Sequence, residues 1–574
     1  MTYMDFSMSN CKNCYKCLRY CPVKAIKFEN EKANIVQERC INCGHCLEIC
    51  PQNARRIYSD LPIVKNAILA RKKIVATIAP SFFGHFGESY GKVLSALKKL
   101  GFSDLQETAL GAEIVTKLYH DYIKGTSKNN YITTCCPSVN HLIEKYFSEL
   151  IDYVIPINTP MMAHGKIIKK LYGEDTFTVF IGPCIAKKSE ADNYLLNDRF
   201  IDAVLTYEEI EEWIKEENID LNSENHIETT NIAFKTGRRY AIHGGIIQAI
   251  GNIEGKKLKK ISISGIEECI EIFESMKKGY LKNTLVEVSA CKGSCVGGPH
   301  SIKRNGEYFK KLSSIKEYVN KKENNKIKRY IQVPKDIDFT VKFMPKNIED
   351  KVTTEEEIEK IMNSMGKYSE EDELNCGVCG YDTCREKAIA VYNGMAETNM
   401  CLHYMRNKAE SMSNFIFEHS GTCVLVLNGE LKIKEINPAG EEMFTVKAEN
   451  VRDKSISVLM NEEDFREVKN TGKSIIGKKI IVSQYDLVFI ENIVYLPKQD
   501  IIVASMANIV EEEKNRKELL KVKENTFNAA QEVIEKQMRV AQEIASLLGE
   551  TTAETKITLT KLKKVVEGEE GEIR

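Results

Sequence analysis

The sequence predicts a multidomain protein that combines α/β and α+β parts. Its 574 residues correspond to roughly four domains at about 150 residues each. The 19 cysteines fall in separate groups, and a long central segment alternates short apolar runs with amphipathic helices, which is typical of parallel sheets flanked by helices. Because 81 Lys and Arg balance 82 Asp and Glu, the net charge does not favour a nucleic acid or an anionic membrane as partner.

Residues 1–60 contain one cysteine pattern twice. Each copy reads Cys-x-x-Cys-x-x-Cys-x-x-x-Cys-Pro, and the copies comprise Cys11, Cys14, Cys17 and Cys21, then Cys40, Cys43, Cys46 and Cys50. Iron prefers soft thiolate ligands, so the spacing favours 4Fe-4S clusters, with structural zinc as the alternative. The pattern resembles that of two-cluster ferredoxins. This resemblance implies that the last cysteine of each copy serves the other cluster, giving the ligand sets Cys11, Cys14, Cys17 and Cys50, and Cys40, Cys43, Cys46 and Cys21.

Three further motifs lie in residues 61–335, where we expect an α/β core. They read Thr133-Thr134-Cys135-Cys136-Pro137, Gly182-Pro183-Cys184-Ile185-Ala186-Lys187-Lys188-Ser189-Glu190 and Ala290-Cys291-Lys292-Gly293-Ser294-Cys295-Val296-Gly297-Gly298. Together they resemble the three signature motifs of the FeFe hydrogenases, and the resemblance covers residues 1 to about 335.

This resemblance implies an H-cluster, which is a 4Fe-4S cube bridged by a cysteine sulfur to a two-iron site with carbonyl, cyanide and azadithiolate ligands. Matched position by position, the cube ligands are Cys136, Cys184, Cys291 and the bridging Cys295. Cys135 stays free of metal and exchanges protons with the azadithiolate amine; the alternative is a spare buried cysteine. Lys187 donates to an iron-bound cyanide, because a buried ammonium requires an anionic partner. The other expected cofactor contacts are Ala79, Pro80, Gly182, Pro183 and Ser289.

The sequence also departs from the family pattern. In catalytic members a proton relay runs from the free cysteine through a glutamate and a serine to a second glutamate. Counting from the motif, the glutamate positions fall on Tyr119 and Tyr122 and the serine position on Ile155. Gly182 and Ser289 replace the methionines that usually pack against the two-iron site. Because isoleucine cannot pass a proton, we expect an altered cavity and slow turnover.

Residues 350–408 contain a third compact cysteine group, formed by Cys376, Cys379, Cys384 and Cys401. Its spacing resembles the small 4Fe-4S domains of several anaerobic redox complexes. We therefore expect one 4Fe-4S cluster here, with zinc as the alternative. The cysteines assigned so far would hold four cubanes: two in the N-terminal domain, one in the H-cluster and one in this small domain.

Residues 411–510 predict an antiparallel sheet. The runs 423–428 and 431–436 predict a hairpin closed by a type I′ turn at Asn428-Gly429, and a helix is expected to begin at Asn437-Pro438. These elements and the later apolar runs resemble a PAS domain. In residues 511–574 apolar side chains recur every seven residues, at Phe527, Ile534, Ala541 and Leu548. This helix either forms a dimeric coiled coil or packs on its own domain.

The combination of these segments resembles sensory FeFe hydrogenases. It implies slow reversible H2 oxidation and proton reduction, with a redox signal relayed through 4Fe-4S clusters to the PAS domain. Partners would be a ferredoxin or another electron carrier and a signalling kinase or phosphatase, with a homodimer through the PAS domain and helix. The alternatives are an ordinary ferredoxin-coupled bidirectional hydrogenase and a hydrogenase-like iron-sulfur redox protein without the two-iron site. Without an apolar span or a signal-peptide pattern, we expect a cytoplasmic protein that binds neither membrane nor nucleic acid.

Overall fold

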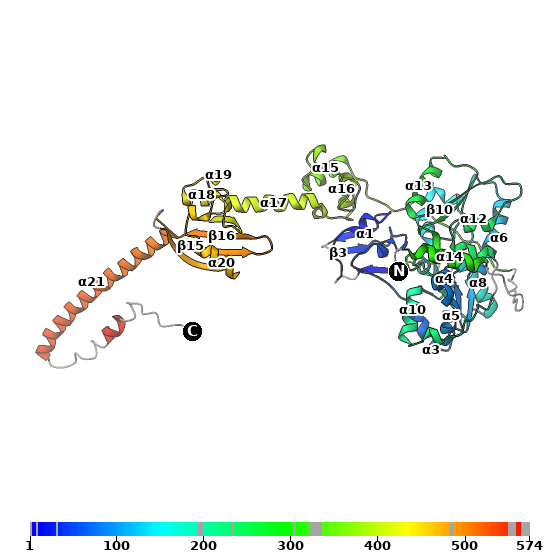
Figure 1. Ribbon diagram of the computed structural model, residues 1–574, viewed down its shortest axis with the longest axis horizontal. Coiled ribbons are helices and arrows are strands. Elements are labelled where there is room, and N and C mark those ends of the chain that lie inside the picture. Colours follow the sequence, from blue (N-terminus) through cyan, green and yellow to red (C-terminus); the bar gives the residue numbers. More distant parts are fainter. Residues whose placement is uncertain are drawn as a thin grey trace. The chain divides into compact units, whose positions relative to one another are not determined.

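The computed structural model (Figure 1) describes residues 3–6, 10–29, 32–192, 199–231, 235–301, 306–320, 334, 336–482, 486–548 and 558–563. The chain forms two compact units, Met1–Met405 and Arg406–Arg574. The predicted multidomain architecture of α/β and α+β parts is confirmed. No helix in the described ranges combines the length and apolar character needed to cross a bilayer.

The N-terminal segment contains two small antiparallel sheets. Strand β1 (Met4–Phe6) pairs with β4 (Arg55–Ile57), and β2 (Ile26–Glu29) pairs with β3 (Lys32–Ile35). The short helices α1 (Lys16–Arg19) and α2 (His45–Glu48) each carry the third cysteine of one sequence copy, Cys17 and Cys46. The cysteine repeat is therefore also a structural repeat.

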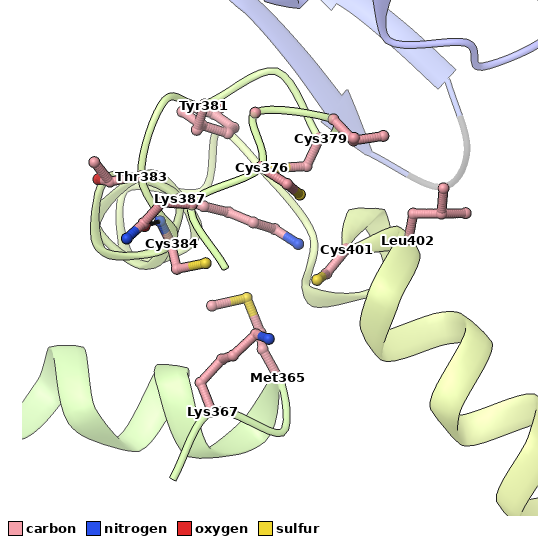
Figure 2. Close-up of a pocket in the computed structure, with 13 residues that line it drawn as sticks. Met365, Lys367, Cys376, Cys379, Tyr381, Thr383, Cys384, Lys387, Cys401 and Leu402 are labelled. Atoms are coloured by element: carbon pink, nitrogen blue, oxygen red, sulfur yellow. Dashed lines mark hydrogen bonds between the residues drawn. The ribbon is translucent and has the colours of Figure 1, made fainter. Parts of the chain in front are cut away.

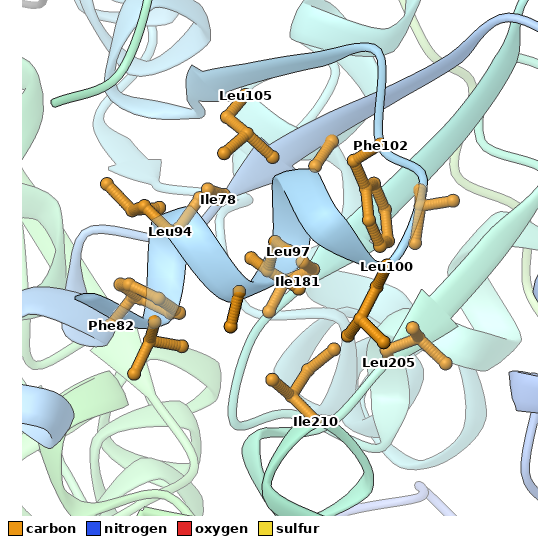
Figure 3. Packing of buried hydrophobic residues seen from close by; sticks show 14 of the residues in the cluster. Ile78, Phe82, Leu94, Leu97, Leu100, Phe102, Leu105, Ile181, Leu205 and Ile210 are labelled. Carbon is orange, nitrogen blue, oxygen red and sulfur yellow. The ribbon is translucent and has the colours of Figure 1, made fainter. Parts of the chain in front are cut away.

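A four-stranded parallel sheet forms the first half of the central α/β part. Its order is β6 (Asp104–Glu107), β5 (Ile74–Ile78), β8 (Phe177–Ile181) and β9 (Ala203–Leu205). Every residue of β5 and β8 is buried, because helices cover both faces of such a sheet. Figure 3 shows the core packing of Ile78 and Ile181 against Leu97. The helices of this half are α3 (Leu61–Leu69), α4 (Ser81–Phe86), α5 (Tyr90–Lys99), α8 (Pro160–Tyr172), α9 (Ala186–Ala191), α10 (Tyr207–Glu216) and α14 (Glu307–Asn320).

The second half contains a three-stranded parallel sheet. Its order is β10 (Lys259–Ser264), β11 (Thr284–Ser289) and β7 (Asn130–Ile132). The helices of this half are α6 (Ala109–Gly125), α7 (Pro137–Tyr146), α11 (Lys235–Arg238), α12 (Gly245–Ile250) and α13 (Ile266–Lys277). Since both sheets are parallel, the loops after their strands provide the usual place for a site.

The small cysteine-containing domain packs on the N-terminal segment. It consists of α15 (Glu355–Ser364), α16 (Cys384–Tyr392) and the turn Thr398–Met400, and α17 (Leu402–His419) begins directly after Cys401. Arg19 donates to the Val378 carbonyl at 2.9 Å, and Lys24 donates to the Gly380 carbonyl at 2.7 Å. These contacts join segments that are far apart in sequence within the first unit.

The second unit has a PAS-like fold, an antiparallel five-stranded sheet with helices between its second and third strands. The sheet order is β13 (Ile433–Ile436), β12 (Cys423–Asn428), β16 (Ile501–Asn508), β15 (Leu487–Leu496) and β14 (Ile475–Val482). The inserted helices are α18 (Pro438–Phe444), α19 (Ala448–Val451) and α20 (Glu463–Thr471). The Asn437 side chain caps α18 by accepting from the Gly440 N–H at 3.0 Å, so the expected helix start is present.

The β12–β13 hairpin is present, but its predicted turn type is wrong. In this loop the positive φ belongs to Leu431, at 60°, and not to Asn428 or Gly429. The Asn428 side-chain oxygen accepts from the backbone N–H groups of Glu430 at 3.1 Å and Lys432 at 2.8 Å. This local capping holds the chain in a longer loop than a type I′ turn allows.

Helix α21 (Val510–Leu548) extends for 39 residues. Among its described side chains, Phe527 and Ile534 are half-buried and Ala541 is exposed, while the Leu548 side chain lies outside the described residues. Leu520, Val533 and Ile544 are each more than half exposed. The helix therefore leaves most of its apolar side chains uncovered by its own unit, which disfavours the alternative of packing back on the domain.

Candidate functional site: a cysteine-lined cavity

One cavity lies at the carboxyl ends of strands from both parallel sheets. The space that its wall borders, including the part open to solvent, is about 920 Å³. Its wall is formed largely by the segments that come directly after β5, β7, β8 and β11. The wall includes the predicted residues Ala79, Pro80, Cys135, Cys136, Pro183, Cys184, Lys187, Ser289, Cys291 and Cys295. The structure thus brings together side chains from all three motifs.

The four predicted cube ligands surround this cavity. Burial raises the pKa of Cys184 to about 12 and that of Cys291 well above 9, whereas the Cys295 side chain is exposed. The Ala290 N–H points at the Cys136 sulfur at 3.5 Å. Buried thiols with such pKa values stay protonated at neutral pH, and a bound metal displaces their protons. The donor set therefore fits an iron-sulfur cube.

Lys187 lies in the cavity wall but has a partner within the chain. Its ammonium donates to the Glu190 carboxylate at 2.7 Å and to the Thr159 hydroxyl at 2.9 Å. Burial alone would lower the pKa of Lys187, but the Glu190 carboxylate and nearby thiolates raise it. Glu190 therefore already supplies a negative charge on one side of this ammonium, and the expected hydrogen bond from Lys187 to a cofactor anion stays a prediction.

Cys135 lies beside a buried phenol. The Tyr119 hydroxyl is 3.6 Å from the Cys135 sulfur and 2.7 Å from the Thr134 hydroxyl. Burial raises the pKa of Cys135 to about 12 and that of Tyr119 well above 10. Both groups therefore hold their protons at neutral pH.

The positions counted for the missing relay do lie near one another. Tyr119 and Ile155 belong to one buried cluster, and Tyr122 and Cys135 pack against it. None of the four side chains is a carboxylate, and Ile155 is fully buried. The route that family resemblance predicts for protons is therefore filled with apolar and phenolic groups.

Glu287 is a cavity residue that the sequence reasoning missed. It lies on β11, and its carboxylate accepts from the backbone N–H groups of Gly244 and Ile247, each at 2.9 Å. Burial raises its pKa, although these hydrogen bonds and one from Ser262 oppose the shift. The Ser262 hydroxyl is 3.3 Å from the ring of the exposed His243. The sequence feature that could have identified Glu287 is its position as a single acidic residue within the apolar run that precedes the third motif.

Gly182 is the one predicted cofactor contact that does not line the cavity. A Cβ on Gly182 would lie 2.5 Å from the Phe180 ring and 3.2 Å from the Ala79 Cβ. The Phe180 ring occupies the wall instead. The glycine therefore makes room for the Phe180 ring.

The two N-terminal ligand sets are also brought together. Cys11, Cys14, Cys17 and Cys50 line one pocket. Cys40, with Cys21, Cys43 and Cys46 beside it, packs in the cluster that also includes Cys136. Burial raises the pKa of Cys40 to about 11 and of Cys46 to about 12. The grouping is the exchanged one that resemblance to two-cluster ferredoxins implies.

The second N-terminal set lies against the cavity motifs. Gly44, with φ of 78°, is so close to the second and third motifs that a Cβ would lie 2.6 Å from Ile185 and 2.9 Å from Pro299. Lys145, on the helix that follows Cys136, donates to the Cys40 carbonyl at 2.6 Å. These contacts fix the cysteine-rich loop beside the cavity.

Figure 2 shows the pocket of the small domain, in which Cys376, Cys379, Cys384 and Cys401 face a common space. The Lys387 side chain extends into that space from α16. Among the described residues, no three His, Cys, Asp or Glu side chains converge closely enough to hold a single metal ion. The cysteines of each group instead border a space larger than one ion needs.

Comparison with protein families assigns three segments. The family described as iron only hydrogenase large subunit, C-terminal domain, matches residues 72–299. This segment of the chain is similar to that family. A 4Fe-4S dicluster domain matches residues 4–51, and an Fe-S cluster family matches residues 372–403. The chain is therefore an FeFe hydrogenase-like iron-sulfur protein, and its families imply 4Fe-4S clusters and an H-cluster.

The curated relatives of this hydrogenase-like chain have low identity. Iron hydrogenase 1 of Clostridium pasteurianum is 26% identical over 42% of the chain and 53% of its own length. The chain thus spans about half the length of this relative. The periplasmic [Fe] hydrogenase large subunit of Nitratidesulfovibrio vulgaris is 28% identical over 52% of the chain and 85% of its own length. A cytosolic Fe-S cluster assembly factor of Encephalitozoon cuniculi is 26% identical over 33% of the chain and 56% of its own length.

Solved structures are similar to separate parts of the chain. An FeFe-hydrogenase from Chlamydomonas reinhardtii aligns with 51% of this chain and all of its own, with 16% identity and a TM-score of 0.39. The PAS domain of nitrogen regulation protein NR(II) from Vibrio parahaemolyticus aligns with 17% of this chain and 98% of its own, with 21% identity and a TM-score of 0.16.

Proposed function

We propose that the protein is a sensory FeFe hydrogenase, which oxidises H2 and reduces protons slowly and transmits the redox state of its clusters to the PAS-like domain. The observation that carries this proposal is the convergence of Cys136, Cys184, Cys291 and Cys295 on one cavity that also exposes Cys135 and Lys187. A cube alone would need only the four ligands.

When bound, the H-cluster would supply the metal centre at which H2 is split or formed. The chain's own residues would hold the group: the cysteines of the three motif loops would provide the thiolates, and Lys187 offers an ammonium at the wall. The cavity wall is largely apolar, which strengthens such electrostatic contacts.

Proton supply is the step that the chain limits. Cys135 is the proton-bearing side chain next to the expected azadithiolate, but beyond it lie Tyr119 and Ile155. On another wall, Glu287 connects through Ser262 to the exposed His243. This second route includes one buried carboxyl with a raised pKa, so we expect it to carry protons more slowly than a relay of two glutamates.

Signalling would use the segments after the small domain. The 4Fe-4S clusters exchange electrons with the H-cluster and with a ferredoxin or another carrier. Leu520, Val533 and Ile544 on α21 are more than half exposed. Together with the seven-residue repeat in the sequence, these uncovered side chains support a homodimeric coiled coil. A separate kinase or phosphatase would then read the state of this dimer.

Infrared spectroscopy and hydrogen exchange test the proposal. The matured protein should show carbonyl and cyanide bands, and H2 should change amide exchange between Ser413 and Leu548 or the affinity for a partner. A Cys295→Ser variant should show neither change. Bands without any H2-dependent change would favour the ordinary ferredoxin-coupled hydrogenase.

The third reading, an iron-sulfur redox protein without the two-iron site, has one observation in its favour. The similarity to a curated protein named as an Fe-S cluster assembly factor covers a third of this chain. Cys135 argues against it, because a thiol outside the four cube ligands has no evident role on the wall of a cavity that holds a cube alone. Absence of carbonyl and cyanide bands after maturation would support it.

A further inference from the structure

The small domain contains a buried lysine whose side chain lies among four cysteines. Lys387 lies on α16 and is 2% exposed. Its side chain points into the space bordered by Cys376, Cys379, Cys384 and Cys401 (Figure 2). A buried ammonium is costly unless it is hydrogen-bonded and paired with a negative charge.

The described residues provide only part of what this ammonium needs. Lys387 donates to the Thr398 backbone carbonyl at 2.9 Å, and within the described ranges it forms no ion pair with Asp or Glu. The acidic groups that face the ammonium in this pocket are the cysteine thiols.

The pocket residues fit a thiolate-held cluster for this reason. Metal binding keeps all four thiols deprotonated, so the group as a whole is anionic, and one buried cation offsets part of that charge. The neighbouring Lys367 also lines the pocket but donates to the Asp372 carbonyl. The Lys387 charge is the one aimed at the cysteines in Figure 2.

We propose that Lys387 raises the reduction potential of the 4Fe-4S cluster held by Cys376, Cys379, Cys384 and Cys401. Reduction adds one negative charge to the cluster, and a fixed positive charge nearby in a medium of low dielectric favours that form. The inference rests on the proposed iron-sulfur assignment of this group. A raised potential makes an electron more stable in this small domain, which directly precedes the PAS-like domain in sequence, than it would be without the lysine charge.

The test is a redox titration of the full-length protein followed by electron paramagnetic resonance. Lys387→Gln keeps a donor of similar reach for the Thr398 carbonyl but removes the charge. The signal of the small-domain cluster is identified as the one that changes in Cys384→Ser. In Lys387→Gln the midpoint potential of this signal should be lower than in wild type, and the midpoint potentials of the other cubane signals should be unchanged. Lys387→Arg should return that signal towards the wild-type potential. Lys360→Gln, an exposed lysine on α15, should move none.

An unchanged or raised potential in Lys387→Gln would overturn the inference. So would zinc at the site, or loss of about four irons from Lys387→Gln but not from Lys387→Arg, because the lysine would then serve assembly rather than potential. Chemical reductants reach the cluster without H2, so the result is independent of whether the hydrogenase proposal holds.

Discussion

The Tyr119 hydroxyl lies 3.6 Å from the Cys135 sulfur and accepts a hydrogen bond from the Thr134 N–H at 2.9 Å. Thr134 in turn donates through its hydroxyl to the Ile157 carbonyl at 2.8 Å. The network that begins at Cys135 therefore ends on the backbone in a buried cluster. A phenol whose pKa is raised well above 10 by burial does not release protons as a carboxyl group does.

Replacing Cys135 with alanine should separate assembly from turnover. Because Cys135 is not a cube ligand, infrared spectra of Cys135→Ala should keep the carbonyl and cyanide bands. H2 turnover should fall about tenfold or more, since the nearest proton donor is lost. Cys423→Ala, which removes a buried thiol from the PAS-like core, should leave turnover unchanged. Loss of the bands in Cys135→Ala would mean that the Cys135-Cys136 pair was assigned in the wrong order.

Glu287→Gln should slow turnover while preserving the cluster. The amide keeps the shape of the side chain but cannot carry a proton between the cavity and Ser262. With an artificial electron donor, we expect the rate of H2 turnover to be about tenfold lower and to depend less on pH than in the wild-type protein. Glu267→Gln, on the exposed start of α13, is the matched control. Equal rates in both variants would exclude the Glu287 route.

Iron analysis tests the ligand sets together. Four cubanes and a two-iron site correspond to about 18 irons per chain. Cys384→Ser should lose about four of them, and the same change at Cys423 should lose none. A plateau at about 14 irons with bound zinc would show that the small domain is a zinc site.

Because the carboxyl group of Glu491 is buried, we predict that the stability of the PAS-like domain depends on pH. Glu491 is fully buried on β15, and neither carboxylate oxygen has a hydrogen-bond partner in the described part of the chain. Burial raises its pKa from 4.5 to about 7. The folded state therefore binds the proton more tightly than the unfolded state, so stability falls as pH rises from 4.5 to 7 and stays low above 7.

Glu491→Gln should remove this dependence and stabilise the domain above pH 7 by roughly 2 kcal/mol. Hydrogen exchange of the β15 amides, corrected for intrinsic rates, measures it in the full chain. Glu435→Gln, on the exposed side of β13, should retain the wild-type slope. A wild-type domain that gains stability between pH 5 and 8 would contradict the prediction.

Ending the chain at Met405 should preserve the hydrogenase chemistry. The first compact unit is Met1–Met405 and contains all the assigned cluster ligands. The truncated protein should keep its infrared bands and its turnover in the artificial-donor assay, but it should lose H2-dependent binding of any signalling partner. A large loss of turnover would show that the second unit takes part in the chemistry.

Sequence reasoning found the side chains whose positions follow from strand order. Cys136, Cys184 and Cys291 each come shortly after a buried parallel strand, and such strands end at the same edge of their sheets. It missed interactions that depend on tertiary packing. The Glu287 route and the burial of Lys387 each require knowing which way a side chain faces, and the spacing of residues does not contain that information. The Lys187–Glu190 ion pair, by contrast, joins positions three apart on one helix, and the spacing alone could have indicated it.

The small domain that packs on the N-terminal segment is synthesised much later than that segment. The hydrogen bond from Arg19 to Val378 closes a separation of 359 residues, and that from Lys24 to Gly380 closes one of 356. Chains emerge from the ribosome N-terminus first, so the first cysteine repeat waits uncovered until more than 350 further residues have been made. The surface beside the N-terminal loops is therefore completed only after the small domain has been made, and a ribosome stalled before residue 378 leaves that surface open.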